Sequence, residues 1–232
     1  MSCIAIITAR GGSKRIPHKN IRPFCGKPIL AYTIEAALRS GVFEEVMVST
    51  DDEAIAEVAR QYGAAVPFLR SEQTSGDFVS SSDAVAEVLH RYAEAGRRFD
   101  VVANLYPTAP FVTAERLRDA VDRLLASDAE TLVPVVRFSF PPQRGFLIAD
   151  GELRLALPQY RETRSQDLEP LYHDAGQFYL ARADAFARCP RFYGDHILPY
   201  ELPELEVQDI DTLSDWEIAE FKYQLLHKEE RP

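Results

Sequence analysis

The sequence predicts an α/β protein with a three-layer, doubly wound and mostly parallel sheet, and two observations support this. Apolar runs of strand length alternate with segments whose apolar residues recur at helical spacing, from the first residues to about residue 138. The apolar runs contain few polar residues, as expected of parallel strands that are buried on both faces. The 232 residues suit one domain, so we expect a single domain over residues 1–232.

The expected strands and helices alternate in order along the chain. Strands are expected over residues 3–9, 45–50, 65–69, 100–106 and 131–138. Helices are expected over residues 28–40, 53–62, 80–93 and 117–125. Pro28 suits the first turn of its helix and Gly41 suits its end. Thr50 with Glu53 forms a capping-box pattern at the start of the second helix.

The pattern changes after residue 138. Asp150 and Gly151 separate two short apolar runs, which is typical of a two-residue β-hairpin turn. We therefore expect residues 139–170 to form an inserted antiparallel arm that folds over a site or reaches into a partner subunit. The elements expected beyond the arm are a strand over residues 171–180 and a helix over residues 212–226.

The charge of the chain is negative overall but unevenly distributed. A net charge of -10 argues against general nucleic-acid binding, which depends on a basic surface. The first acidic residue is Glu35, and the basic residues that precede it are Arg10, Lys14, Arg15, Lys19, Arg22 and Lys27. A basic segment in an acidic protein indicates a dedicated anion site.

Hydropathy and cysteine usage bear on the compartment. No apolar run approaches the roughly 20 residues that span a bilayer, and the start of the chain lacks the pattern of a secretion signal. The three cysteines are widely spaced and form no CxxC pair, which suggests reduced thiols. We expect a cytoplasmic protein that binds neither membranes nor nucleic acid.

The loop after the first strand is the first candidate site. Its residues of interest are Ala9, Arg10, Gly11, Gly12, Ser13, Lys14, Lys19 and Asn20. Ligands of open α/β sheets bind beyond the carboxyl ends of the strands, where glycines let backbone N–H groups approach phosphate and basic side chains neutralise its charge. The spacing matches neither GxGxxG nor the P-loop pattern. The alternative interpretation is an ordinary solvated turn.

The second candidate is the pair Asp209 and Asp211, just before the last helix. In an extended segment, residues two apart point to the same side, so both carboxylates can face one cation. Magnesium is commonly held by one or two carboxylates together with phosphates and waters. The alternative is helix-start chemistry, with Thr212 as cap and Asp215 three residues later. The two interpretations are compatible.

The third candidate is the segment of residues 171–179. Tyr172, His173, Asp174 and Gln177 could bind a hydroxylated substrate, and Gly176 would permit its close approach. The alternative is a strand with mixed faces. His173 has no second ligand at zinc spacing, and the chain lacks the GxSxG motif and a recognisable cysteine nucleophile, so hydrolase chemistry is not indicated.

Together, and in this order, these segments resemble the CMP-sugar synthetase family. The stretch IITARGGSKRIPHKN, residues 6–20, is similar to the family's opening CTP-binding motif. YPTAP, residues 106–110, stands at its second sugar-site motif, and DIDT, residues 209–212, at its metal motif. The resemblance covers nearly the whole chain. It implies the Rossmann-like fold of nucleotide-diphospho-sugar transferases, CTP as substrate, Mg²⁺ as cofactor and a homodimer.

The resemblance also implies a role for individual residues. The nucleotide would be bound by Ala9, Arg10, Gly11, Gly12, Ser13, Lys14, Lys19, Asn20, Arg70 and Ser81. The catalytic residues would be Arg10, Lys14 and Lys19, which offset charge, and Asp209 and Asp211, which hold magnesium. The sugar would be bound by Tyr106, Pro107, Thr108, Ala109, Arg164, Gln166, Tyr172, His173, Asp174 and Gln177.

Residues 163–179 and 205–223 look like the pseudaminic acid branch of the family. Tyr106 stands where the sialic acid branch has glutamine, and Asp174 where it has asparagine, which argues against N-acetylneuraminate. The implied reaction transfers CMP from CTP to pseudaminic acid and releases pyrophosphate. The alternatives are a cytidylyltransferase for N-acetylneuraminate, legionaminate or a Kdo-type sugar, a nucleotide-binding regulator on the same fold, and an interaction module that uses the arm.

Overall fold

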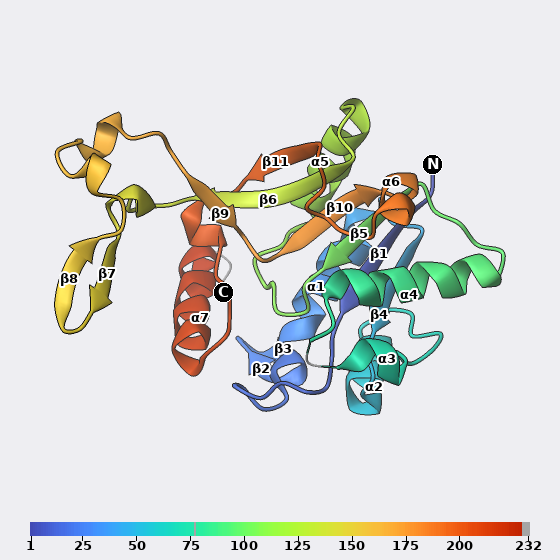
Figure 1. Ribbon diagram of the computed structural model, residues 1–232. Helices are drawn as coiled ribbons and strands as arrows, with labels where there is room; N and C mark the ends of the chain where they lie inside the picture. Colours follow the sequence, from blue (N-terminus) through green and yellow to red (C-terminus); the bar gives the residue numbers. More distant parts are fainter. Residues whose placement is uncertain (77, 229–232) are drawn as a thin grey trace.

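A seven-stranded sheet forms the centre of the computed structural model, which describes residues 1–76 and 78–228 (Figure 1). The strand order is β11-β6-β10-β5-β1-β4, and β9 pairs with β6. The bounds are β1 Cys3–Thr8, β4 Glu45–Ser49, β5 Val101–Leu105, β6 Thr131–Arg137, β9 Tyr172–Asp174, β10 Phe178–Arg182 and β11 Ile197–Glu201. Strands β9 and β10 run against the others, so the predicted mostly parallel sheet is confirmed.

Helices cover both faces of the sheet, which confirms the three layers. Helices α1 (Ile29–Ser40), α2 (Glu53–Gln61) and α5 (Ala114–Ala126) share a core with one face. Helices α4 (Ser81–Glu94) and α6 (Ala183–Arg188) lie on the other. Strand β1 contributes Ala5 and Ile7 to the first core and Ile4 and Ile6 to the second, because successive side chains of a strand point to opposite faces.

Shorter elements complete the chain. They are α3 (Glu72–Ser75), the strand pair β2 (Pro23–Phe24) and β3 (Lys27–Pro28), and the 3₁₀ turns η1 (Lys19–Ile21), η2 (Pro142–Arg144), η3 (Pro158–Tyr160), η4 (Ser165–Asp167) and η5 (Glu204–Glu206). The last helix, α7 (Leu213–Leu226), packs on a third core through Trp216 and Ala219. Among the described residues, no helix combines the length and apolar character that a membrane span requires.

The ends of two helices test the expected caps. Gly41 ends α1 in the left-handed region, with φ at +67°, as predicted. The predicted capping box at Thr50 is wrong, because Asp52 caps α2 by accepting hydrogen bonds from the backbone N–H groups of Ala54 and Ile55 at 2.8 and 3.4 Å. A carboxylate directly before the first turn satisfies amides that lack helical partners.

The predicted bounds of two strands were wrong. Residues 65–69 form only a single bridge, between Ala65 and Met47, since Pro67 has no N–H to extend the ladder. The strand expected over residues 171–180 divides into β9 and β10 at Gly176, whose φ of +62° turns the chain. Strand β11 was not predicted. It contains Pro199 and lies at the edge of the sheet, where proline is tolerated.

The predicted hairpin is present between β7 (Phe146–Ala149) and β8 (Glu152–Leu155). Asp150 and Gly151 both have positive φ, at +54° and +77°, as a type I′ turn requires. The hairpin extends away from the sheet, with α7 between it and the body of the molecule (Figure 1). Every side chain of β7 is exposed.

Candidate active site

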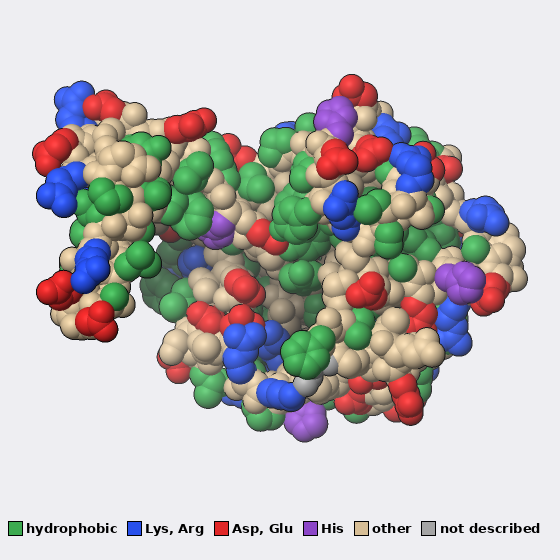
Figure 2. Space-filling model, in the orientation of Figure 1, with side chains coloured by type: hydrophobic (Ala, Val, Ile, Leu, Met, Phe, Trp, Pro, Cys, Tyr) green, Lys and Arg blue, Asp and Glu red, His purple; other side chains and the backbone are tan. Residues whose placement is uncertain are grey.

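A cavity of about 710 Å³ opens at the carboxyl ends of β1 and β5. We call it the cleft. Thr8 ends β1 and lines the cleft, and Tyr106, which follows β5, lines it from another side. The space-filling view shows the molecule hollowed beside a group of basic and acidic side chains (Figure 2). This is the edge of the sheet at which the sequence places the candidate phosphate loop.

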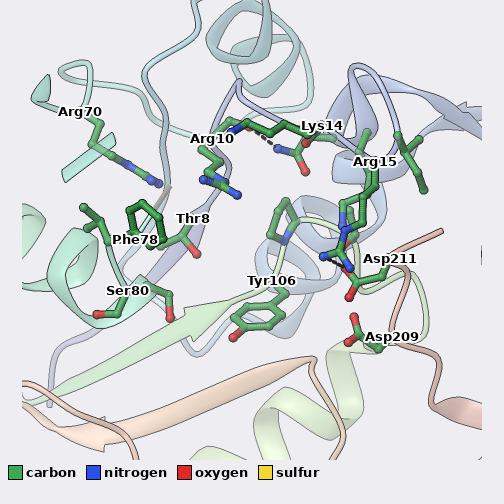
Figure 3. A pocket seen from close by; sticks show the side chains of 18 residues that line it. Thr8, Arg10, Lys14, Arg15, Arg70, Phe78, Ser80, Tyr106, Asp209 and Asp211 are labelled. Carbon is green, nitrogen blue, oxygen red and sulfur yellow. Dashed lines mark hydrogen bonds and ion pairs between the residues drawn. The ribbon is translucent and has the colours of Figure 1, made fainter. Parts of the chain in front are cut away.

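Most of the predicted nucleotide residues come together in the cleft. They are Arg10, Ser13, Lys14, Lys19, Asn20, Arg70 and Ser81. The loop is held in shape by the Asn20 side chain, whose Nδ2 donates to the Arg10 carbonyl at 2.9 Å. Arg70 approaches from the opposite wall, and its guanidinium and that of Arg10 point toward each other across the space (Figure 3).

Three predicted nucleotide residues, Ala9, Gly11 and Gly12, do not line the cleft. The Gly11 N–H donates to the Asp51 carboxylate at 2.9 Å. A Cβ at Gly11 would lie 2.9 Å from the Cβ of Asp52, which is closer than real Cβ atoms approach. Glycine here permits the loop to pack against the chain that follows β4. Ala9 is buried and donates its N–H to the Ser49 carbonyl at 2.9 Å.

Arg70 is a largely buried cation. Its Nη2 donates to the Ser49 carbonyl at 2.6 Å, and its Nε to the Ser49 hydroxyl at 3.0 Å. Burial lowers the pKa of Arg70 from its ordinary value, although the charges of Asp51 and Glu87 partly offset that effect. Arginine stays charged throughout the working pH range, so the cleft wall carries a fixed positive charge.

Lys19 connects the basic loop to the acidic pair. Its Nζ donates to the Ile210 carbonyl at 2.7 Å and lies 3.8 Å from Asp211 Oδ1. Burial lowers the pKa of Lys19, against the charges of Asp211 and Asp209, which raise it. The two sequence segments, which are about 190 positions apart along the chain, therefore form one site.

Asp209 and Asp211 both line the cleft. Asp211 Oδ1 lies 2.8 Å from Arg15 Nη2, and the Asp209 carboxylate lies beside it (Figure 3). Burial and then the charge of Asp211 raise the pKa of Asp209, while Lys19 acts in the opposite direction. Carboxylates that burial and mutual repulsion destabilise are suited to bind a cation.

The helix-start interpretation of this segment is confirmed. Thr212 and Asp215 form a complete capping box at the start of α7, so Asp215 serves the helix while Asp209 and Asp211 face the cleft. No group of three or more potential metal ligands exists within residues 1–76 and 78–228. Two carboxylates fit a magnesium ion whose other ligands come from substrate phosphates and water.

The residues that were predicted to bind the sugar divide into two sets. Tyr106, Pro107 and Thr108 line the cleft, and Ala109 is buried beneath them. Gln177 does not line the cleft. Its side chain is buried, and the side-chain amide donates a hydrogen bond to the Glu206 backbone carbonyl. The Gln177 backbone carbonyl accepts a hydrogen bond from the Tyr106 N–H at 2.8 Å.

The remaining residues that were predicted to bind the sugar lie outside the cleft of their own chain. Arg164 pairs with Asp167 at 2.7 Å, and Gln166 lies at the base of the arm. Tyr172 is exposed on β9, and the His173 ring packs 4.7 Å from that of Phe138. Asp174, at the end of β9, accepts hydrogen bonds from the Tyr179 and Tyr193 hydroxyls.

The structure adds residues that sequence reasoning did not assign to the site. They are Thr8, Arg15, Ile16, Phe78, Val79 and Ser80. Arg15 belongs to the basic segment and could have been included on that ground. The Phe78 ring is fully exposed beside Ser80 on the wall formed by the start of α4 (Figure 3), and nothing in its sequence surroundings indicated a role.

Comparison with known proteins shows the family of the chain. A family model described as "Cytidylyltransferase" matches residues 4–146. The chain is 39% identical over 229 residues to the pseudaminic acid cytidylyltransferase of Campylobacter jejuni strain 81-176, covering 98% of this chain and 99% of that protein. It is also 39% identical to the CMP-N,N'-diacetyllegionaminic acid synthase of Legionella pneumophila, covering 95% of each.

A solved structure shares the fold. A CMP:2-keto-3-deoxy-manno-octonic acid synthetase complexed with CTP superimposes with a TM-score of 0.71 at 19% identity, over 99% of this chain and 100% of that one. The chain belongs to the cytidylyltransferase family and is a nucleotidyltransferase that uses CTP.

Proposed function

We propose that this cytidylyltransferase transfers CMP from CTP to pseudaminic acid and releases pyrophosphate. The observation that carries the proposal is that one cleft holds the basic loop, the Asp209 and Asp211 pair, and the Tyr106 to Thr108 segment. Similarity over nearly the whole length to a pseudaminic acid cytidylyltransferase favours this acid. The equal identity to a legionaminic acid enzyme makes that acid the alternative to test.

The residues of the cleft would divide the work by charge. Arg10, Lys14 and Lys19 would bind the triphosphate and offset the charge that develops on the departing pyrophosphate. Arg70 and Ser81, on the opposite wall, would hold the nucleotide. Asp209 and Asp211 would hold Mg²⁺, which supplies neutralisation of phosphate charge when bound.

The reaction would be an in-line displacement. The anomeric hydroxyl oxygen of the acid sugar forms a bond to the α-phosphorus of CTP as the bond between that phosphorus and pyrophosphate breaks. The hydroxyl proton passes to water, because no histidine among the described residues lines the cleft. Positioning of the two substrates and fixed positive charge therefore supply most of the rate enhancement.

We also propose that the arm, residues 139–170, joins two copies of the chain. Its hairpin exposes Phe146, Ile148 and Leu153, with 56, 80 and 62% of their surfaces accessible, which is unusual for a stable apolar surface in water. The predicted sugar residues Arg164 and Gln166 lie outside the cleft of their own chain. In a dimer, the arm would carry them toward the cleft of the partner.

The substrate assignment is tested by competition. CTP, Mg²⁺ and equal concentrations of pseudaminic, legionaminic, N-acetylneuraminic and Kdo acids are incubated with the protein, and the CMP-sugars are identified by mass spectrometry. The proposal predicts CMP-pseudaminic acid as the main product. A different main product would keep the cytidylyltransferase and replace the acid, while CTP binding without any product would favour a regulator.

A further inference from the structure

A short segment that follows β4 holds two opposite walls of the cleft. Residues 49–52 run from the last residue of β4 to the cap of α2, and none of them lines the cleft. One wall is the basic loop, residues 9–20, which carries Arg10, and the other carries Arg70 (Figure 3). We call residues 49–52 the anchor segment.

The basic loop is tied to the anchor segment by two backbone amides. The Ala9 N–H donates to the Ser49 carbonyl at 2.9 Å, and the Gly11 N–H donates to Asp51 Oδ1 at 2.9 Å. A Cβ at Gly11 would lie 2.9 Å from the Cβ of Asp52, so the loop lies directly against the anchor segment. The Gly11 amide therefore fixes the loop rather than binding phosphate.

Arg70 is tied to the same segment from the opposite wall. Its Nη2 donates to the Ser49 carbonyl at 2.6 Å, its Nε donates to the Ser49 hydroxyl at 3.0 Å, and its backbone N–H donates to the Thr50 carbonyl at 2.8 Å. Ser49 and Thr50 are buried. The Ser49 carbonyl accepts from both Ala9 and Arg70, so the spacing of the two walls depends on the anchor segment.

Asp51 is the exposed side chain of the anchor segment that holds the loop. Hydrogen bonds to an ionised acceptor are stronger than neutral ones, so the carboxylate restrains the loop before any ligand arrives. A loop without this restraint has to be ordered when the ligand binds, and the lost conformational freedom weakens binding.

We propose that Asp51 is a positioning residue for CTP, which holds the basic loop at the spacing from Arg70 at which both walls contact one nucleotide. This inference rests on the proposed binding of CTP in the cleft and not on the identity of the acid sugar. The negative charge of Asp51 acts in the opposite direction, because it repels the phosphates. That repulsion is screened by salt at an exposed position, so the restraint outweighs it.

Two substitutions of Asp51 separate the restraint from the charge. Asp51→Ala removes both the acceptor and the charge. Asp51→Asn removes the charge and keeps an oxygen that can accept the Gly11 N–H. The matched control is Asp100→Ala, since the exposed Asp100 carboxylate likewise accepts a backbone N–H, that of Ser2 at 2.8 Å, outside the cleft.

The experiment measures the Kd for CTP by calorimetry in the presence of Mg²⁺, and the KM for the acid sugar by steady-state kinetics. Asp51→Ala is expected to raise the Kd about tenfold, the effect of one hydrogen bond to a charged group, and to leave the KM for the acid unchanged. Asp51→Asn is expected to stay within about threefold of the wild-type Kd. Asp100→Ala is expected to change neither value.

Gly11→Ala supplies a second test that does not depend on the folding of Asp51→Ala. The added methyl group meets the Asp52 side chain and should displace the same loop, so the Kd for CTP should rise here too. Combined with Asp51→Ala, the two effects should multiply to less than the product of the single effects, because both release one loop.

The outcomes distinguish this inference from the function on which it rests. An unchanged Kd in Asp51→Ala overturns the positioning role, as does an equal loss of affinity in Asp51→Ala and Asp51→Asn. Tighter CTP binding by both variants also overturns it, because repulsion would then dominate. Wild type that binds no CTP overturns the proposed nucleotide site together with the inference, whereas turnover of a different acid changes only the proposed substrate.

Discussion

Asp211 shows how single residues balance charge in the cleft. Its carboxylate contacts Arg15 at 2.8 Å and Lys19 at 3.8 Å. The Arg15 side chain is 66% exposed, and exposed ion pairs contribute only about 0–1 kcal/mol. The pair is therefore easily exchanged. In the proposed function, the substrate phosphates take over the two cations and the carboxylate becomes available to magnesium.

Arg164 is the residue for which structure and resemblance differ most. The resemblance places it at the sugar, yet it pairs with Asp167 in the arm. If it reaches a partner's cleft, Arg164→Ala should raise the KM for the acid sugar about tenfold, through loss of a charge-assisted hydrogen bond, and leave the KM for CTP unchanged. Steady-state kinetics with each substrate varied in turn measures both values.

A matched control for this variant lies in the same arm. Arg154→Ala removes an arginine that pairs with Glu152 at 3.1 Å on the hairpin, and it should leave both KM values at those of wild type. Equal kinetics for Arg164→Ala and Arg154→Ala would rule out contact with the sugar carboxylate.

Some cleft residues could be predicted from the sequence and others could not. Arg10, Lys14 and Lys19 stand close together in a segment without acids, so their shared role was readable. Asp209 was readable from its spacing to Asp211. Phe78 had no such signal, because the packing of α4 beside β1 brings it to the cleft from a loop without a pattern.

At the scale of elements, the short helix α3 is held to α4 by one carboxylate. Glu87 of α4 accepts hydrogen bonds from the Ser71 N–H at 3.0 Å, the Ser71 hydroxyl at 3.1 Å and the Thr74 hydroxyl. Burial acts to raise the pKa of Glu87, but these hydrogen bonds and the Arg91 charge outweigh it and hold the pKa below its ordinary value.

This shift predicts a pH-dependent contribution to stability. Because the folded pKa of Glu87 is depressed, its contribution is fully present above the unfolded pKa of about 4.3 and is lost as the pH falls through the folded value. Urea titrations should show Glu87→Gln to be less stable than wild type by about 1 kcal/mol at pH 7. The difference should shrink at acid pH.

Glu57→Gln provides the comparison, since Glu57 lies on the exposed face of α2 and its carboxylate accepts a hydrogen bond from the Gln61 side chain at 3.1 Å. It should be close to wild type at both pH values. A Glu87→Gln variant whose deficit is the same at pH 7 and in acid would contradict the assignment.

The elements that sequence reasoning missed share a physical reason. The segment over residues 65–69 has strand-like composition, but one proline stops its ladder. Strand β11 contains Pro199. The sheet tolerates this proline because β11 is an edge strand that pairs only with β6. Whether a proline-containing segment becomes a strand depends on its place in the sheet, which composition does not encode. Strand β1, which is apolar from Cys3 to Ile7, was predicted within one residue.

At the scale of the whole molecule, the arm is the basis for the dimer that we expect. Ile148→Lys places a charge on the most exposed apolar residue of the hairpin, so it should convert the proposed dimer to a monomer while the fold is retained. Light scattering coupled to size exclusion measures the mass. Activity should fall as well, since each cleft would lose the partner's arm.

Gln61→Lys serves as the control, because it adds the same charge at an exposed position of α2, away from the arm. It should remain a dimer. A monomeric wild type, or a dimeric Ile148→Lys, would exclude the arm as the contact between copies.

The central claim is that the acidic pair and the basic loop form one catalytic site, and pyrophosphate release by Asp211→Asn tests it most directly. The rate is measured at saturating CTP, Mg²⁺ and acid sugar, beside wild type and the control Asp184→Asn, whose carboxylate pairs with Arg188 outside the cleft. The account predicts a fall in kcat of at least about 100-fold for Asp211→Asn and none for the control. An Asp211→Asn variant that releases pyrophosphate as fast as wild type would contradict it.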